Sequence, residues 1–424
     1  MSLAALRRGE MAGATRVDLV RCGLTAWPEE LDALANCLEV LDLSGNPLTA
    51  LPHGLARFTR LRVLFLSGTA IRRLPEVLGE CPALSQIGLR GGSLEEIPGH
   101  ALPPALRWLT VTDNALTSLP EALGTRPLLQ KLLLAGNRLT ALPESLADAD
   151  ALELLRLSAN RLEGLPGWLS ALPRLAWLSW AGNRFDPPPE PAGPAITWAR
   201  LAGDRALGEG ASGHVREMRL TPEERPVAVK LFKGRMTSDG LPEREMAAML
   251  AVGAHPHLLP VLGRVSDHPE GRDGLVLPLL PEGMRPLAGP PSPASCTRDV
   301  YADHMRLSVA QLLAIGRGIA SAMAHLHARS LCHGDLYAHN ILWNGADAVL
   351  TDFGAASLLP PAPAMPRLAL LESRAFGILL GELLDRCPEA VAIPALSQLA
   401  STCMTADVAA RPAMADITAS LSAV

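Results

Sequence analysis

A leucine repeat with a period of 23 residues fills the first half of this 424-residue chain. Its units open at seven leucines, 23 residues apart except for one interval of 22: Leu38, Leu61, Leu84, Leu106, Leu129, Leu152 and Leu175. The units follow the pattern L-x-x-L-x-L-x-x-N-x-L and end at Leu-Pro or Ile-Pro, and a degenerate unit at residues 17–28 precedes them. A fixed period of this length predicts a stacked array of small units, capped at its end, rather than a single globular core.

Each unit is expected to hold one short strand. Leu41 and Leu43 alternate and would point into a shared core, since neighbouring side chains of a strand face opposite sides. Asparagines that can bond the backbone recur where the chain leaves the strand: Asn46, Asn114, Asn137, Asn160 and Asn183. Other residues replace them in three units, where this ladder should be weaker: Cys22, Thr69 and Gly92. Prolines then stop the strand and start the opposite side: Pro52, Pro75, Pro98, Pro120, Pro143 and Pro166.

This pattern resembles the leucine-rich-repeat family over about 170 residues. The resemblance implies an α/β solenoid with a parallel sheet on its concave face, a surface that usually binds proteins. The register assigns nine residues to that face: Val63, Phe65, Trp108, Thr110, Thr112, Leu133, Arg156, Trp177 and Ser179. Trp108 and Trp177 stand out because aromatic residues are enriched at interfaces. The alternatives are that both are ordinary surface residues or touch the neighbouring domain.

A proline-rich segment ends the repeats. Five prolines lie between residues 187 and 194, which favours an extended spacer over a helix. The sequence therefore predicts a repeat domain at residues 1–186, a linker at 187–199 and a second domain at 200–424.

The second domain opens with a glycine motif followed by a lysine strand. Residues 208–215 read G-x-G-x-x-G-x-V, and Val-Ala-Val-Lys ends at Lys230. In this order, backbone N–H groups can cover phosphates while an ammonium pairs with them. The chain has only two other lysines, Lys131 and Lys233, so a lysine in this position carries weight. A helical pattern at residues 242–250 follows, and Glu245 is the expected partner of Lys230, with Glu243 as the alternative.

Two acidic motifs complete the set. Residues 333–340 read His-Gly-Asp-Leu-Tyr-Ala-His-Asn, in which Asp335 can accept the proton of an attacking hydroxyl and Asn340 can ligate a metal. Twelve residues later comes Asp-Phe-Gly, and the carboxylate of Asp352 suits Mg²⁺, which prefers oxygen ligands.

From about residue 200 to 424 the chain resembles the eukaryotic-type protein kinases. The resemblance implies an α+β fold of two lobes, with ATP and Mg²⁺ between them. Asp335, Lys230 and Glu245 would be catalytic, and Asn340 and Asp352 would bind the metal. The nucleotide would contact the loop, the lysine and the strand after it: Gly208, Gly210, Ser212, Gly213, Val215, Lys230, Leu277 and Leu279. Residues 372–384 are similar to the large buried helix of the second lobe, and residues 407–412 to the closing arginine motif.

The sequence also departs from that family. Gly334 replaces a common arginine, and Tyr337 replaces the lysine usual in serine/threonine kinases. Only 20 positions separate Asp352 from Glu372, with no Ala-Pro-Glu motif, so Arg411 lacks its usual partner. Ser357 is the only hydroxyl residue between them, which argues against control by phosphorylation there.

These observations predict an ATP-dependent protein kinase acting on serine or threonine, possibly on itself, with the repeats binding a protein substrate or regulator. One alternative is a small-molecule phosphotransferase of the aminoglycoside and choline kinase type, which shares the His-Gly-Asp motif. The other is a pseudokinase scaffold, against which stands the presence of every charged motif residue. The role of the proline-rich insert at residues 281–306, a surface loop or a contact for the repeats, stays open.

Composition narrows the setting. Seven scattered cysteines without a C-x-x-C pair fit a reducing compartment, and the N-terminus does not read as a signal peptide. No run of about 18 apolar residues predicts a membrane span. A net charge of −5 supplies no basic field for nucleic acid. We expect a cytoplasmic protein, and the arginine-rich, lysine-poor composition suggests a bacterial one.

Overall fold

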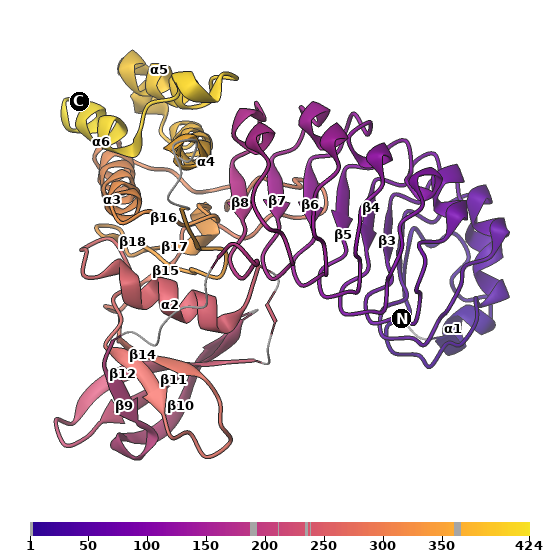
Figure 1. Ribbon diagram of the computed structural model, residues 1–424, viewed down its shortest axis with the longest axis horizontal. Helices are drawn as coiled ribbons and strands as arrows, with labels where there is room; N and C mark the ends of the chain where they lie inside the picture. Colours follow the sequence, from indigo (N-terminus) through magenta and orange to yellow (C-terminus); the bar gives the residue numbers. More distant parts are fainter. Residues whose placement is uncertain (1–2, 187–192, 211, 234–235, 238, 360–365) are drawn as a thin grey trace. The chain divides into compact units, whose positions relative to one another are not determined.

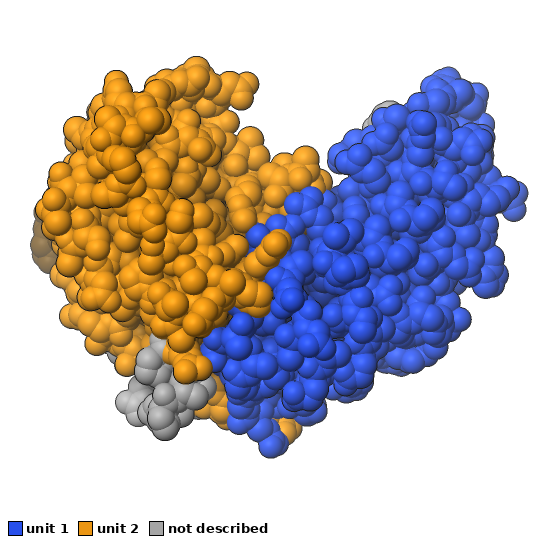
Figure 2. All heavy atoms as spheres, turned by 90° about the horizontal axis from the view of Figure 1, so that it is seen from above, with its two compact units in different colours: residues 1–172 blue, residues 173–424 orange. Residues whose placement is uncertain are grey.

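The computed structural model describes residues 3–186, 193–210, 212–233, 236–237, 239–359 and 366–424. The chain divides into two compact units, residues 1–172 and 173–424, which Figure 2 shows in different colours. This division falls before the proline-rich segment that the sequence suggests as the linker, and residues 187–192 of that segment lie outside the described residues. The last repeat strand, β8 (Trp177–Ser179), therefore belongs to the second unit.

The first unit is a parallel sheet built from the repeats. After helix α1 (Leu3–Arg7), each repeat contributes one three-residue strand: β1 (Arg16–Asp18), β2 (Val40–Asp42), β3 (Val63–Phe65), β4 (Gln86–Gly88), β5 (Trp108–Thr110), β6 (Lys131–Leu133) and β7 (Leu154–Arg156). Each strand pairs in parallel with the next one in sequence, as Figure 1 shows for β3–β7. The central residue of every strand pairs with its counterpart, so apolar side chains such as Leu109, Leu132 and Leu155 stack in one fully buried row.

The other side of the first unit consists of short 3-10 helices. They are η1 (Glu29–Leu34), η2 (His53–Arg57), η3 (Glu76–Glu80), η4 (Gly99–Ala101), η5 (Glu121–Leu123), η6 (Glu144–Asp148) and η7 (Gly167–Ala171). A proline in extended conformation stands directly before each of them: Pro28, Pro52, Pro75, Pro98, Pro120, Pro143 and Pro166. Proline fixes φ and has no N–H, which suits the position just before a helix. The sequence prediction that these prolines begin the second side of each repeat is confirmed.

Asparagine side chains bond the turns after the strands. The amide nitrogen of Asn137 donates to the carbonyls of Val111 and Leu134, both at 2.9 Å, and its oxygen accepts the N–H of Leu116. Asn46, Asn114 and Asn160 make the same three kinds of bond in their own repeats. The hydroxyl of Thr69, one of the predicted replacements, donates to the carbonyl of Leu66. Each asparagine thus bonds buried backbone groups of two successive repeats. The threonine hydroxyl makes only one such bond.

An Asn137→Ala variant is expected to lower the free energy of unfolding of the repeat unit by about 2–3 kcal/mol. It leaves the buried N–H of Leu116 without its acceptor and removes one of the two asparagine donors from each of the Val111 and Leu134 carbonyls. Thr69→Ala, which removes a single bond, is the matched control and should cost about 1 kcal/mol. Urea unfolding followed by circular dichroism measures both. Equal costs for the two variants would contradict the bonding role of the asparagine.

The second unit begins with β8 and then forms a six-stranded sheet. Its strands are β9 (Ala195–Thr197), β10 (Leu201–Glu209), β11 (Gly213–Leu220), β12 (Arg225–Phe232), β13 (Gly263–Ser266) and β14 (Gly274–Pro278), in the order β10-β11-β12-β14-β13-β9. Strand β9 and the turn η8 (Trp198–Arg200) fall at the end of the segment suggested as linker. They join the sheet because Ile196 is buried in its core and β9 pairs with β13.

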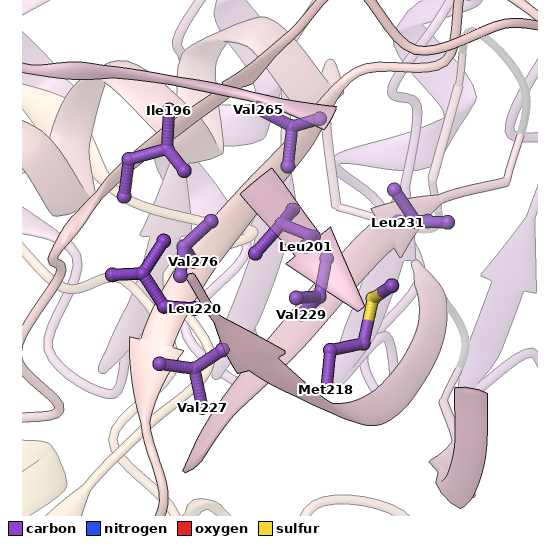
Figure 3. Packing of buried hydrophobic residues seen from close by; sticks show 9 residues of the cluster. All are labelled: Ile196, Leu201, Met218, Leu220, Val227, Val229, Leu231, Val265 and Val276. Atoms are coloured by element: carbon purple, nitrogen blue, oxygen red, sulfur yellow. The ribbon is translucent and has the colours of Figure 1, made fainter. Parts of the chain in front are cut away.

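One face of this sheet is an apolar core and the other carries the motif residues. The core residues that Figure 3 shows are Ile196, Leu201, Met218, Leu220, Val227, Val229, Leu231, Val265 and Val276. Because side chains alternate along a strand, Ala228 and Lys230 of β12 lie on the opposite face. Register places Val215 opposite Lys230, and Leu277 opposite Ala228, so both belong to that second face.

Helices and short strands form the remainder of the unit. The helices are α2 (Pro242–Val252), α3 (Val309–His327), α4 (Pro366–Leu384), α5 (Pro394–Cys403) and α6 (Met414–Ser422), with turns η9 (Ala338–Asn340), η10 (Pro388–Ala392) and η11 (Val408–Ala410). The short strands are β15 (Arg285–Pro286), β16 (Leu331–Cys332), β17 (Ile341–Trp343), β18 (Ala348–Leu350) and β19 (Ser357–Leu358). Sheet and helices together match the predicted α+β fold of two lobes.

Helix α3 is the central helix of the second lobe. It begins with a capping box in which the hydroxyl of Ser308 accepts the N–H of Gln311 and the Gln311 side chain accepts the N–H of Ser308. It contacts α4, α6 and β18, and Leu312, Ile315 and Ile319 are fully buried. Within the described residues, α3 is the one helix whose length and hydropathy would let it cross a membrane, but half of that stretch is buried inside the unit, as in core helices of globular folds.

Trp177 and Ser179 are not open to a partner, although the sequence register places them among the concave residues. Both are buried in the second unit, at 1% and 0% exposure. The indole N–H of Trp177 donates to the carbonyl of Leu336, and the hydroxyl of Ser179 donates to the carbonyl of Asp239. Trp177 is therefore not an exposed binding residue; as in the stated alternative, it contacts residues of the predicted second domain, Leu336 and Tyr337.

Candidate active site

The glycine motif forms the tip of the hairpin between β10 and β11. Gly208 pairs with Val215 across the hairpin, and the N–H of Gly210 donates to the carbonyl of Gly213 at 2.9 Å. A Cβ on Gly213 would lie 2.6 Å from the carbonyl oxygen of Leu231, so only glycine fits there. Ser212 is buried beside it, and Ala211 lies outside the described residues. The motif therefore places a narrow backbone turn at the edge of the sheet.

Lys230 and Glu245 form an ion pair between β12 and α2. Glu245 is 1% exposed, whereas the alternative partner, Glu243, is exposed to solvent. Burial raises the pKa of Glu245 to about 7, although the ammonium of Lys230 acts in the opposite direction. A charge this deeply buried needs its partner, so the pair fixes α2 against the sheet.

Hydrogen bonds from buried groups fix the loop that carries Asp335. His333 is fully buried; its Nε2 lies 3.0 Å from the carbonyl oxygen of Thr351, and its Nδ1 accepts the N–H of Asp335 at 3.2 Å. The amide nitrogen of Asn340 donates to the main-chain oxygen of Asp335 at 2.9 Å and to its carboxylate at 2.8 Å. Asn340, the predicted metal ligand, thus fixes the position of the Asp335 carboxylate.

Gly334 occupies a position that no other residue fits. Its φ is +76°, and a Cβ would lie 2.5 Å from the carbonyl oxygen of Ala355 and 2.9 Å from that of Leu178. Its N–H donates to the buried carboxylate of Glu372 at 2.6 Å. The departure from the arginine common in protein kinases therefore follows from close backbone packing on both sides of the loop.

Asp352 completes the acidic group. It has a φ of +59°, a conformation uncommon outside glycine that clusters at functional sites. Its carboxylate is exposed and accepts the N–H of Gly354 at 3.1 Å, while Phe353 beside it is buried. The backbone at Asp352 thus turns the carboxylate outward and the phenyl ring inward.

One cleft of about 1240 Å³ is lined by some of these residues, but not by Gly213, Lys230 or Glu245. Gly210, Asp335, Asn340 and Asp352 line it. Its remaining lining residues include parts of the insert, residues 285–290, Ala302 and residues 304–306, so this insert forms a wall of the cleft. Of the predicted nucleotide contacts, Val215, Lys230 and Leu277 share the second face of the sheet, and Leu279 lies half-buried just after β14.

Sequence reasoning missed two features of the site. The ammonium of Lys233 pairs with Glu209 and donates to the carbonyl of Gly210, and so ties down the glycine turn. Asp299 of the insert, buried, accepts the N–H of His339 at 3.0 Å and contacts its ring nitrogen at 2.7 Å. Burial lowers the pKa of His339, but Asp299, Asp335 and Asp352 together raise it above its usual value. No spacing rule links residues 299 and 339, so the sequence held no signal for this contact.

The family comparisons agree with this arrangement. Residues 201–364 match the model for protein tyrosine and serine/threonine kinases, and residues 37–58 and 127–185 match leucine-rich-repeat models. A probable myosin light chain kinase of Dictyostelium discoideum is 29% identical over 157 residues, which cover 36% of this chain. The chain spans 45% of the length of that relative. The matched residues 201–364 include the glycine hairpin, the Lys230–Glu245 pair and the residues that line the cleft. Members of this family use ATP. The chain thus carries leucine-rich repeats followed by a tyrosine/serine-threonine protein kinase domain.

Proposed function

We propose that the chain is an ATP-dependent serine/threonine protein kinase in which Asp335 orients the acceptor hydroxyl. The observation that carries this proposal is the convergence of Asp335, Asn340 and Asp352 on one cleft, which Gly210 of the glycine turn also lines. Phosphoryl transfer is catalysed mainly by positioning and by charge stabilisation, which this set of groups supplies. The printed name of the Dictyostelium relative, a kinase of myosin light chain, supports a protein acceptor.

Each motif residue has a role in this proposal. Lys230, held by Glu245, would contact the phosphates of ATP, and the backbone of Gly208, Gly210, Ser212 and Gly213 would cover them. Val215, Leu277 and Leu279 would contact the adenine. Asp335 would accept a hydrogen bond from the acceptor hydroxyl and take its proton as the oxygen attacks the γ-phosphorus, while the bond from that phosphorus to the bridging oxygen breaks and ADP leaves.

Asn340 and Asp352 fit Mg²⁺. The amide nitrogen of Asn340 is directed at Asp335, which turns its oxygen away from that residue, and the carboxylate of Asp352 is exposed in the same cleft. A carboxylate and an amide oxygen are ligands that a hard cation prefers. When bound, the ion would neutralise charge that develops on the transferred phosphoryl group.

The test is transfer of labelled γ-phosphate by the purified full chain. Acceptors are casein, myelin basic protein, an aminoglycoside and choline, and the Asp335→Asn variant and an EDTA-treated sample serve as blanks. Label on serine or threonine of a protein supports the proposal, and label on tyrosine would show that the acceptor residue is tyrosine instead. Label only on a small acceptor would assign the chain to small-molecule phosphotransfer. Absence of transfer with ATP binding intact would favour a scaffold.

We also propose that the first unit binds a protein acceptor or regulator through its parallel sheet. Trp108 is half-buried there, with the ammonium of Lys131 4.2 Å from its ring centroid and its indole N–H donated to Thr110. A Trp108→Ala variant would then raise KM for a protein acceptor identified by the transfer assay, at unchanged kcat. An unchanged KM would argue against this surface.

A cytoplasmic location completes the proposal. None of the seven cysteines, all of which lie among the described residues, forms a disulfide, which suits a reducing compartment. Fractionation of cells that express the tagged chain would test it, and recovery in the membrane or secreted fraction would contradict it.

A further inference from the structure

The segment 173–186, which includes β8, contacts the loop that carries Asp335. The indole N–H of Trp177 donates to the carbonyl of Leu336, the residue after Asp335, at 2.9 Å. The Trp177 ring stacks on Tyr337 with centroids 4.3 Å apart and planes 7° from parallel. The guanidinium of Arg298 lies 5.6 Å from the centroid of the same indole. One side chain therefore contacts the two residues that directly follow the proposed catalytic aspartate.

The same segment fixes the chain after Asp352. The backbone N–H of Trp180 donates to the hydroxyl of Ser357, and its indole N–H donates to the carbonyl of Leu358, both at 3.0 Å. These two bonds fix β19, one through the side chain of Ser357 and the other through the main chain of Leu358. Ser357 is 1% exposed, so its hydroxyl serves this contact and is shielded from modification.

Two buried ionic groups complete the contacts of the segment. Asp186 forms a salt bridge with Arg244 of α2 at 2.9 Å, one residue before Glu245. The guanidinium of Arg411 donates to the carbonyl of Pro173 at 2.7 Å and to that of Thr405 at 2.9 Å. Arg411, whose carboxylate partner the sequence lacks, is thus satisfied in part by the segment itself. The segment reaches the catalytic loop, β19, α2 and the C-terminal helices.

We propose that segment 173–186 is a built-in positioning element of the kinase domain, and that Trp177 is its positioning residue for Asp335. The inference rests on the proposed function. His333 and Glu372 hold the loop through residues 333–335, and Trp177 holds it from residues 336–337. A displacement of about 1 Å at a reacting group can reduce a rate about 100-fold, so a bond to the carbonyl next to Asp335 bears on catalysis.

The position of the bond separates this role from ordinary packing. A tryptophan that only fills space can be replaced by phenylalanine at small cost, because stacking on Tyr337 is retained. A tryptophan that orients the Leu336 carbonyl cannot, because phenylalanine has no N–H. The element would also make activity independent of phosphorylation after Asp352, since tryptophan contacts already order β19.

The experiment compares Trp177→Phe and Trp177→Ala in the full chain. We expect kcat to fall about 10-fold for phenylalanine and about 100-fold for alanine, with ATP affinity and acceptor KM within about twofold of wild type. Trp27→Phe is the matched control, because Trp27 in the first unit likewise donates its indole N–H, to Asp32 at 3.2 Å. This control should leave kcat unchanged. Thermal unfolding of Trp177→Phe should stay close to wild type.

Unchanged kcat in Trp177→Phe, or a loss that appears only in KM, would overturn the positioning role. Hydrogen exchange of residues 333–340 gives a readout that needs no activity: faster exchange in Trp177→Phe than in Trp27→Phe supports the inference, and equal exchange overturns it. If wild type transfers no phosphate, the proposed function fails, while the exchange result still decides whether Trp177 holds the loop.

Discussion

Asp335→Asn is expected to reduce kcat for phosphoryl transfer by about 10²–10⁴-fold and to leave ATP binding unchanged, because a positioned general base contributes a factor of this size. The amide keeps the shape of the carboxylate but cannot accept the proton of the hydroxyl. It can still accept the hydrogen bond from Asn340, which lies 2.8 Å from the carboxylate oxygen. The loop should therefore keep its conformation, and the loss should report the chemistry alone.

Asp385→Asn is the matched control for charge. Asp385 is exposed at the end of α4, outside the residues that line the cleft, and the same substitution there should leave kcat unchanged. Single-turnover transfer and fluorescence titration with a nucleotide measure the two quantities. If Asp335→Asn retained more than about a tenth of the wild-type rate, Asp335 would not be the base.

Lys230→Met is expected to lower kcat about 10²–10³-fold, because it removes the charge that we propose contacts the phosphates of ATP. It should also destabilise the fold by about 3 kcal/mol near neutral pH and above, since Glu245 is left buried without its cation. The double variant Lys230→Met/Glu245→Gln should recover stability but not activity. Lys233→Met removes an exposed ion pair instead and should cost about 0–1 kcal/mol.

The cost of Lys230→Met should depend on pH. Burial raises the pKa of Glu245 to about 7 from the usual 4.5, and loss of the lysine removes the main opposing influence, so the pKa rises further. Below pH 4.5 the carboxyl is neutral in both states and the burial cost is absent. Between pH 4.5 and the raised pKa, the folded state binds the extra proton, so stability falls as pH rises and then levels off.

Thermal unfolding of the lysine variants at pH 5 and pH 8 tests this sign. The deficit of Lys230→Met relative to wild type should be small at pH 5 and large at pH 8, while the deficit of the double variant should be similar at both. A deficit of equal size at both pH values would mean that the carboxylate of Glu245 is not the cause.

Local patterns were sufficient for most of the fold. The 23-residue period determines the strands and the turns after each proline, because every repeat buries its leucines only against its neighbours. The choice of Glu245 over Glu243 followed from its distance in sequence to His255, and the structure pairs Glu245 with Lys230. Such features depend on residues that are close in sequence or on a spacing that repeats along this chain.

Other features needed the tertiary structure. The alternation of side chains along a strand predicts which face of the sheet Trp177 lies on, but not which residues pack against that face. In the structure, Leu336 and Tyr337 contact Trp177. From its motif alone Gly334 was only a departure from the arginine common in protein kinases, and the structure shows that two backbone carbonyls leave room only for glycine. The insert at residues 281–306 had no periodic signal, and its contact with His339 arises from folding.

The sequence alone determined that this chain has a leucine-repeat array and a complete set of kinase motifs, because both are written in short-range spacing. Only the tertiary structure showed that Trp177, Trp180 and Asp186, which belong by sequence to the repeats, make their contacts in the second unit. Burial of an indole and pairing of a carboxylate depend on partners from about 60 to nearly 180 residues away, and no local pattern encodes such partners.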